Sequence, residues 1–156
     1  MEFYFFAEDL EALDQKIKEL DLLVREAGKD MGESCQQSAE TYHDNAPYEE
    51  AVRSFEMYSR RLAEFQRIRN QVRVISPPAN ADMVKAGCWV RTINLGSGAE
   101  KIIKVGSYIV ARDCEISYVS PLARLLTGAK IGEVREGLIG NGNVEYKVLD
   151  ISLSQP

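Results

Sequence analysis

The first half of the chain has the hydrophobic spacing of two helices. Apolar residues recur at alternating intervals of three and four positions over residues 10–31, and again over residues 48–72. This spacing is that of the a and d positions of a coiled coil. Two such helices joined by a short turn are expected to fold back as an antiparallel hairpin. The pattern therefore predicts a helical hairpin domain over residues 1–75, with its tip near residues 41–47.

The second half has the shorter periods of a β domain. Strand-like runs are found at residues 88–95, 100–106, 108–119, 132–139 and 144–153. The pair Asn141-Gly142 between two of them is a strong hairpin signal. One helical insert begins after Ser120, a typical N-cap residue, has Pro121 at its first position and ends at Gly128. Together with the hairpin, these runs predict an α+β protein in which residues 76–156, after a proline-containing linker, form a small antiparallel β domain with one short helix.

Composition narrows the class of protein. The 156 residues are 45% hydrophobic and 28% charged, which is typical of a soluble, folded chain. A net charge of −5 argues against a surface that binds nucleic acid as a whole. Three cysteines without a C-x-x-C pair, and a single histidine, favour a reducing compartment over a zinc site or disulfide framework. No run is long and apolar enough to span a membrane, so we expect a cytoplasmic protein that binds no membrane.

The predicted turn between the helices has two possible roles. Locally, Asp44 and Asn45 suit a turn or helix cap, and Pro47 suits the first position of the second helix. His43, the only histidine, is expected to be a solvated turn residue rather than a catalytic base. Alternatively, carboxylates at the end of a narrow rod can enter a channel and help hold a divalent ion. Mg²⁺ prefers one or two carboxylates together with water and substrate phosphates.

Arginines on the predicted second helix also have two possible roles. Arg53, Arg60 and Arg61 are among them. They can form the ordinary salt-bridging face of a coiled coil, or they can line a groove that touches a phosphate backbone. The sequence alone leaves both interpretations open.

Four stretches resemble the bacterial GreA/GreB transcript cleavage factors. The tip reads DNAPY at 44–48, where the family has Glu-Asn-Ala-Glu-Tyr, and the end of the second helix reads VISPP at 74–78. The most specific stretch is VSPLARLLTGAKIGEV at 119–134, which NVEYKVLDI follows at 143–151. The family has Ser-Pro-x-Ala-Arg-x-Leu-x-Gly and then Val-Glu-Tyr-x-Val in its carboxyl domain. The resemblance covers nearly the whole chain.

This resemblance implies a fold and a partner. The carboxyl domain would be FKBP-like and would dock at the rim of the secondary channel of bacterial RNA polymerase, while the coiled coil reaches down that channel. The docking residues it implies are Ser120, Pro121, Ala123, Arg124 and Gly128. The chain would be an accessory factor and not an enzyme, meeting the nascent RNA 3′ end only indirectly. It would have no cofactor of its own and would share Mg²⁺ with the polymerase active site. We expect a monomer.

The tip departs from the family pattern Gly-Asp-Leu-x-Glu-Asn-Ala-Glu-Tyr. Asp44 stands at the position of the metal-side glutamate, whereas Thr41 stands at that of the aspartate and carries no charge. Glu40 is the adjacent acid that would replace it. The residues that would support the tip are Thr41, His43, Asn45, Ala46 and Tyr48. Two functions therefore remain open: stimulating the polymerase to cleave backtracked RNA, or inhibiting or regulating the polymerase through the same channel without cleavage.

Two functions of other classes are also compatible with parts of the pattern. An FKBP-like domain suggests a peptidyl-prolyl isomerase, but a fold alone does not confer that activity. An isomerase pocket needs clustered aromatic residues, and the second half offers only Trp89, Tyr108, Tyr118 and Tyr146. A coiled-coil adaptor that does not bind polymerase is the second alternative.

Overall fold

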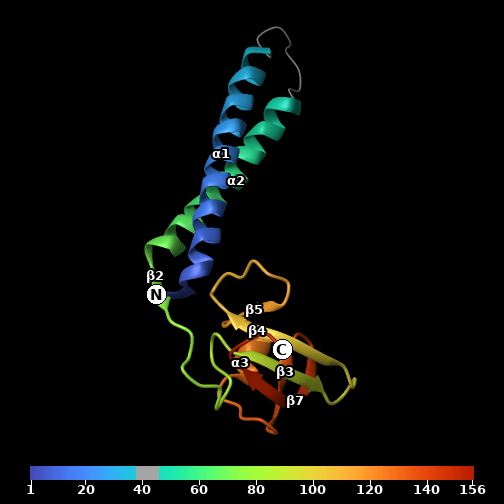
Figure 1. Cartoon of the computed structure of the whole chain (residues 1–156). Helices are drawn as coiled ribbons and strands as arrows, with labels where there is room; N and C mark the ends of the chain where they lie inside the picture. Colours follow the sequence, from blue (N-terminus) through green and yellow to red (C-terminus); the bar gives the residue numbers. More distant parts are fainter. Residues whose placement is uncertain (38–45) are drawn as a thin grey trace. The chain divides into compact units, whose positions relative to one another are not determined.

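The computed structural model of the chain describes residues 1–37 and 46–156 (Figure 1). Its two long helices are α1 (Ala7–Gln37) and α2 (Ala46–Asn70), and strands dominate the second half. Helices and strands are thus segregated along the chain, which confirms the predicted α+β class. No helix in the described ranges is long and apolar enough to cross a membrane.

The chain divides into two compact units. The first contains Met1 and Glu11–Val72, and the second contains Glu2–Leu10 and Arg73–Pro156. This division differs from the expected boundary at residues 75 and 76 mainly because residues 2–10 pack with the β domain. The ring of Phe3 lies 4.4 Å from that of Tyr108, and Phe6 lies against Gly87. Burial of these phenylalanines ties the amino-terminal segment to the second unit.

The first unit is an antiparallel pair of helices. Along α1, Leu13, Leu20 and Ala27 are buried, and the seam positions between them are half-buried. Two cross-helix contacts set the direction. The Arg69 Nε lies 2.6 Å from Asp14 Oδ1. The Phe55 ring packs over Gly28, where an added Cβ would lie 3.6 Å from it. Residue numbers rise along one helix and fall along the other, as the heptad pattern predicts for a hairpin.

The second helix ends earlier than the sequence predicts. α2 ends at Asn70 rather than at Ser76-Pro77-Pro78, because β2 (Val72–Ile75) intervenes. β2 pairs with β1 (Phe3–Phe6) in a two-stranded sheet. The sequence Val-Arg-Val-Ile is rich in β-branched residues, which fit a strand better than a helix end once a partner strand is available. That partner comes from the other end of the domain and was not expected from the sequence.

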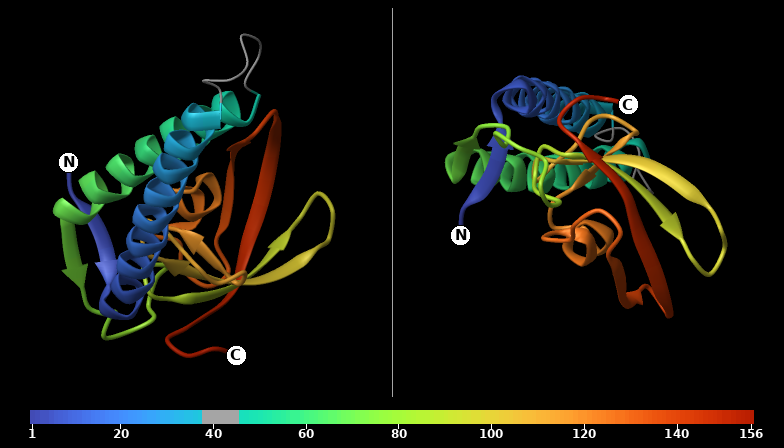
Figure 2. Two further views of the ribbon diagram at one scale, coloured as in Figure 1. Left: turned by 90° about the horizontal axis from the view of Figure 1, so that it is seen from above. Right: turned by 60° about the horizontal axis from the view of Figure 1, so that its bottom comes forward.

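The second unit is built on a five-stranded sheet. Its strands are β3 (Trp89–Asn94), β4 (Glu100–Gly106), β5 (Glu115–Ser117), β6 (Val134–Ile139) and β7 (Gly142–Ser152), in the order β5-β4-β3-β7-β6. β7 is the long red strand of Figure 2. β3, β4, β6 and β7 pair antiparallel as predicted, but β5 is parallel to β4, so the sheet is mixed.

The run 108–119 shows why β5 is shorter than expected. Its first part serves as the connection that returns the chain to run parallel to β4. The Tyr108 N–H donates to the Tyr4 carbonyl oxygen, and its own carbonyl accepts from the Ser117 hydroxyl. These backbone groups are thus used outside a strand ladder, which leaves only Glu115–Ser117 to pair.

The core of the second unit lies between one face of the sheet and α3 (Pro121–Leu126). Val90, Val105 and Val148 from three neighbouring strands are completely buried there, together with Ala123 and Leu126 of the helix. The helix begins and ends as the sequence predicts, with Pro121 at its first position and a glycine of positive φ beyond its end.

Candidate functional site

The predicted tip falls largely outside the described residues. Those outside are Glu40, Thr41, His43, Asp44 and Asn45. The other two predicted tip residues begin the second helix: Ala46 is its first residue, and Tyr48, which is 37% exposed, lies in its first turn. The second helix thus begins one residue before Pro47, which was expected at its first position, and the metal-assisting role of Asp44 and Glu40 stays a prediction.

An open polar groove of about 310 Å³ lies between the ends of α1 and α2 that approach the tip. Its walls are formed by Asp30, Glu33, Ser34, Pro47, Glu50, Ala51 and Ser54. One of its three acids, Glu33, is already close to a base, because the Lys29 Nζ lies 3.9 Å away. Among residues 1–37 and 46–156, no three acidic, histidine or cysteine side chains are placed to hold a metal ion. The described groove alone therefore gives no metal site.

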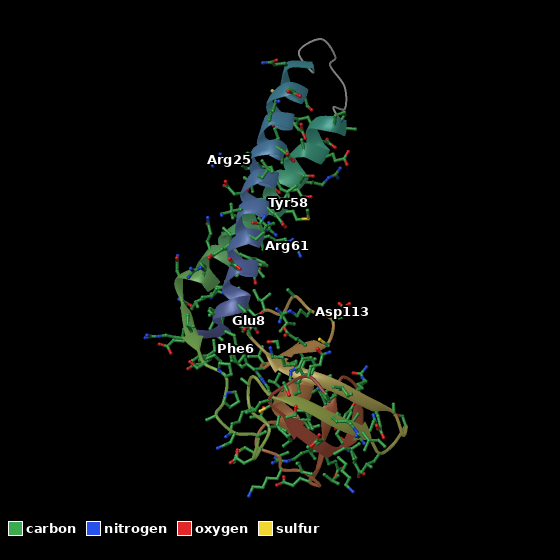
Figure 3. The ribbon with its side chains drawn as sticks, viewed as in Figure 1. Phe6, Glu8, Arg25, Tyr58, Arg61 and Asp113 are labelled. Atoms are coloured by element: carbon green, nitrogen blue, oxygen red, sulfur yellow. The ribbon has the colours of Figure 1, made fainter. Side chains whose placement is uncertain are left out.

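The three singled-out arginines lie exposed on α2. Arg53, Arg60 and Arg61 border an open groove of about 320 Å³, together with Glu56, Met57 and Glu64. No ion pair involves these arginines within the described part of the chain. On α1, in contrast, the Arg25 guanidinium lies 3.0 Å from Asp21. Figure 3 shows Arg25 and Arg61 on their two helices. Contact of these guanidinium groups with a phosphate backbone stays a prediction.

The five residues implied in docking lie at α3 and its ends, but they have different surroundings. The Ser120 hydroxyl accepts from the Ala123 N–H at 3.3 Å and so caps the helix, while Ala123 itself is completely buried. Gly128 has a φ of 84°, which suits glycine after a helix end. Pro121 and Arg124 are exposed. Only these two present their side chains fully to solvent, whereas the other three belong to the framework of the helix and its ends.

An apolar groove of about 460 Å³ borders α3. Its lining comprises Tyr4, Ile75, Ala86, Tyr118, Val119, Arg124 and Thr127. The Tyr4 N–H donates to the Tyr118 hydroxyl at 3.2 Å, and the two rings lie 5.9 Å apart in an edge arrangement. Arg124 is the only charged residue among these seven. Aromatic side chains beside an arginine are the composition typical of protein interfaces.

Sequence reasoning missed the contribution of β1 and β2 to this groove. Tyr4 is 40% exposed between neighbours that are almost fully buried. This alternation is the usual signal of a strand with one buried face, and it is present in the string FYFF. The signal was too short to distinguish a strand from the start of the first helix. It also gave no indication that Tyr4 lies beside Tyr118.

A buried carboxylate is held between two cations at the start of β5. The Glu115 side chain is 1% exposed, and its Oε1 lies 3.0 Å from Arg112 Nη1 and 3.3 Å from Lys104 Nζ. Its Oε2 is buried and accepts no hydrogen bond from the described residues. Lys104 also reaches Glu8 at 3.1 Å, in the first turn of α1 next to Phe6 (Figure 3). This cluster of charges ties the first turn of α1 to β4 and β5.

A second polar contact reinforces the same junction. Asp9 is 7% exposed and accepts a hydrogen bond from the Ser107 hydroxyl at 2.5 Å. The same hydroxyl accepts from the Phe6 N–H at 2.9 Å. Burial lowers the pKa of Lys104, but its hydrogen bond to Glu8 and the charge of Glu115 outweigh burial and raise that pKa above 10.5. Lys104 therefore remains charged throughout the neutral range and keeps both acids paired.

Acid is expected to weaken this junction through Glu8. The hydrogen bond from Lys104, followed by its charge, lowers the pKa of Glu8 below its ordinary value of 4.5. The resulting stabilisation is present above the ordinary pKa and is lost as pH falls through the lowered folded-state pKa. Between about pH 5 and pH 3, the unfolding free energy should fall more steeply for the wild type than for Glu8→Gln. Urea unfolding followed by Trp89 fluorescence measures both slopes, and identical slopes would contradict the role of Glu8.

Comparison with known proteins identifies relatives across most of the chain. A family model for the carboxyl-terminal region of the transcription elongation factors GreA/GreB matches residues 78–153. The transcription elongation factor GreA of Thermosipho melanesiensis is 28% identical over 144 residues, which cover 89% of this chain and 92% of the relative. GreA of Lachnoclostridium phytofermentans is 27% identical over 152 residues, which cover 94% and 93%. The crystal structure of GreA factor homolog 1 (Gfh1) of Thermus thermophilus is 21% identical, with a TM-score of 0.44 and coverage of 97% and 99%.

The sequence relatives define the class of protein as a transcription elongation factor, which is an accessory protein and not an enzyme. The family model and these relatives together support membership of the GreA/GreB family. The family model lies within the second unit, and the full-length relatives extend the match across the helical hairpin. The resemblance seen at residues 119–134 and 143–151 is thus confirmed as a family relationship.

Proposed function

We propose that this chain binds bacterial RNA polymerase and inserts its helical hairpin into the secondary channel to modulate elongation. The observation that carries the proposal is the form of the first unit. Its longer helix has 31 residues, which span about 46 Å at a rise of 1.5 Å per residue. No third helix packs on the pair within the described residues of this unit. A pair of helices about 20 Å across, with an acid at its tip, suits entry into a channel.

The second unit would supply the docking surface. We infer that the partner contacts Arg124 and the groove formed by Tyr4, Tyr118 and Val119. An apolar floor with one cation at its edge suits an apolar protein segment that carries an acid. Ser120, Pro121, Ala123 and Gly128 would support this surface through the geometry of α3. An FKBP-like arrangement, with one helix across a curved sheet, remains part of this proposal.

The exposed arginines would assist at the hairpin. Arg53, Arg60 and Arg61 are free of acidic partners among the described residues, so their guanidinium groups are available to phosphates. In the channel they would lie near nucleic acid and meet the nascent RNA indirectly. The chain would bring no metal ion of its own, and Asp44 would act on Mg²⁺ shared with the polymerase.

Two modes of modulation follow from the tip sequence. In the first, Asp44, with Glu40 replacing the second family acid, helps hold Mg²⁺ so that the polymerase cleaves backtracked RNA. In the second, the chain occupies the channel without stimulating cleavage and inhibits or regulates the polymerase. The uncharged Thr41 at the family's aspartate position is the observation that favours the second mode.

One assay distinguishes these modes. A backtracked elongation complex is incubated with the chain and Mg²⁺, and the RNA length is followed. If shortened RNA appears, Asp44→Ala should abolish the shortening, because it removes the carboxylate at the position of the family's metal-side glutamate. Cleavage by Asp44→Ala at the wild-type rate would contradict the metal role. Slower elongation without shortened RNA would support the second mode, in which the chain regulates the polymerase without stimulating cleavage.

Binding to core polymerase is measured in the same preparation. The wild type and Asp44→Ala should bind equally, since the docking surface is unchanged. Arg124→Glu should bind about tenfold more weakly, because it reverses the only charge in the groove lining. Lys101→Glu is the charge control, because Lys101 is an exposed base outside that lining and forms no ion pair within the described residues. Failure of the wild type to bind would overturn the proposed function.

A further inference from the structure

β6 forms an edge of the five-stranded sheet and has a neighbour on one side only, β7. Ile139 pairs with Gly142 across the two-residue turn that joins the strands. In such hairpins the two residues that flank the turn form a hydrogen-bonded pair. Along the strands, hydrogen-bonded pairs then alternate with pairs that are not hydrogen-bonded to each other. The Glu133 carbonyl accepts from the Val148 N–H, which agrees with bonding to β7 at odd-numbered positions. The N–H and C=O groups of Val134, Glu136 and Leu138 therefore point away from β7.

The side chains of these three residues share one exposed face of the strand. Leu138 is 69% exposed and Val134 is 49% exposed, with Glu136 exposed between them. Gly137 is directed to the other face, where Leu125 of α3 occupies the space that a Cβ would need. The edge thus combines unpaired backbone groups with two apolar side chains. Such an edge is a template for pairing with another strand.

We propose that this edge pairs with the same edge of a second copy of the chain, and that Glu136 limits this pairing. Among twofold antiparallel registers, only the one centred on Glu136 engages all three outward-pointing residues. It forms about six backbone hydrogen bonds, two for each bonded pair. It also places Val134 of each copy opposite Leu138 of the other, which is a favourable apolar cross-strand contact. The sequence of β6 is therefore self-complementary except at its centre.

At that centre the two Glu136 side chains face each other. Like charges directly opposite in an antiparallel pair are destabilising, and glutamate is also a poor strand residue. Arg135 is directed to the other face and lies 3.1 Å from Glu133. Lys147, opposite Val134 on β7, is a base on the exposed face, but no ion pair joins it to Glu136 within the described residues. The charge of Glu136 is thus left to oppose its copy.

The test is the mass of the chain as a function of concentration, measured by sedimentation equilibrium. Glu136→Thr removes the central charge and adds a β-branched residue, so we expect about tenfold tighter dimerisation than for the wild type. Glu145→Thr is the matched control, because Glu145 lies directly opposite Glu136 on β7 but not at the edge. Its dimerisation should stay at the wild-type level. Circular dichroism and Trp89 fluorescence confirm that each variant is folded.

Two further conditions connect the dimer to β6. Adding Leu138→Lys to Glu136→Thr should return dimerisation to the wild-type level or below, since it removes the apolar contact and charges the edge. Raising the salt concentration should bring the wild type closer to Glu136→Thr, because salt screens exposed charges. The proposal is overturned if Glu136→Thr follows the wild-type curve, if Glu145→Thr dimerises equally well, or if Leu138→Lys has no effect. None of these measurements involves polymerase, so the outcome is independent of the proposed function.

Discussion

Replacing Lys104 with methionine is expected to destabilise the second unit by about 2 kcal/mol, because the buried carboxylate of Glu115 is left with one cation instead of two. Lys104 is 15% exposed and lies between Glu8 and the buried carboxylate of Glu115. Methionine retains most of the packing of the lysine stem but supplies no charge. Arg112 would remain the only cation beside Glu115. Urea unfolding followed by the fluorescence of Trp89, the only tryptophan, measures the loss.

Two variants test that the loss arises from the Glu115 pair. Lys101→Met makes the same substitution at an exposed position of β4 and should change the free energy of unfolding by less than about 0.5 kcal/mol. Adding Glu115→Met to Lys104→Met also removes the buried carboxylate that has lost one of its two cations. The double variant should therefore recover at least half of the lost free energy of unfolding. A double variant that is less stable than Lys104→Met would show that the carboxylate is not the cause.

Replacing Gly87 with alanine should destabilise the same unit by about 3 kcal/mol, the sum of backbone strain and overpacking. Gly87 has a φ of 95°, a conformation that L-residues avoid. A Cβ there would lie 2.7 Å from Pro78 Cδ and 3.1 Å from Phe6 Cζ. The Gly87 N–H also donates to the Val105 carbonyl at 2.7 Å, so the segment has little freedom to shift. The midpoint of urea unfolding measures the effect.

Gly132 provides a control for the backbone part of this effect. It has a similar φ of 86°, but a Cβ built there meets no atom within 4 Å. Gly132→Ala should therefore lose only about 1 kcal/mol, the usual penalty for a left-handed residue. Equal losses at the two glycines would show that contact with Phe6 and Pro78 has no energetic weight. The amino-terminal segment would then be less firmly packed than its burial indicates.

Elements with a strong local signal were predicted well. The heptad spacing located both long helices, and the caps Ser120 and Pro121 located α3. Four of the five predicted strand runs correspond closely to β3, β4, β6 and β7. In each case the signal comes from neighbouring residues, whose periodicity or capping acts within the element itself.

Elements that depend on a distant partner were not predicted. β1 and β2 are four-residue strands, and each pairs with a segment about 70 positions away, a separation that local patterning does not report. The parallel direction of β5 also depends on the connection from β4, which brings the chain back along β4 before β5 begins. For the same reason Tyr4 was absent from the expected docking surface, and Glu115 was not recognised as a buried acid.

By itself, the sequence determined the segregation of helices and strands, the two long helices and the resemblance to the family, because these depend on local periodicity and on contiguous motifs. Only the tertiary structure decided which residues meet. It placed Tyr4 beside Tyr118, enclosed Glu115 between Lys104 and Arg112, and put β6 at an edge of the sheet. Tyr4 and Tyr118 are 114 positions apart, and the burial of Glu115 depends on where β4 and the first turn of α1 lie, so neither feature leaves a local trace in the sequence.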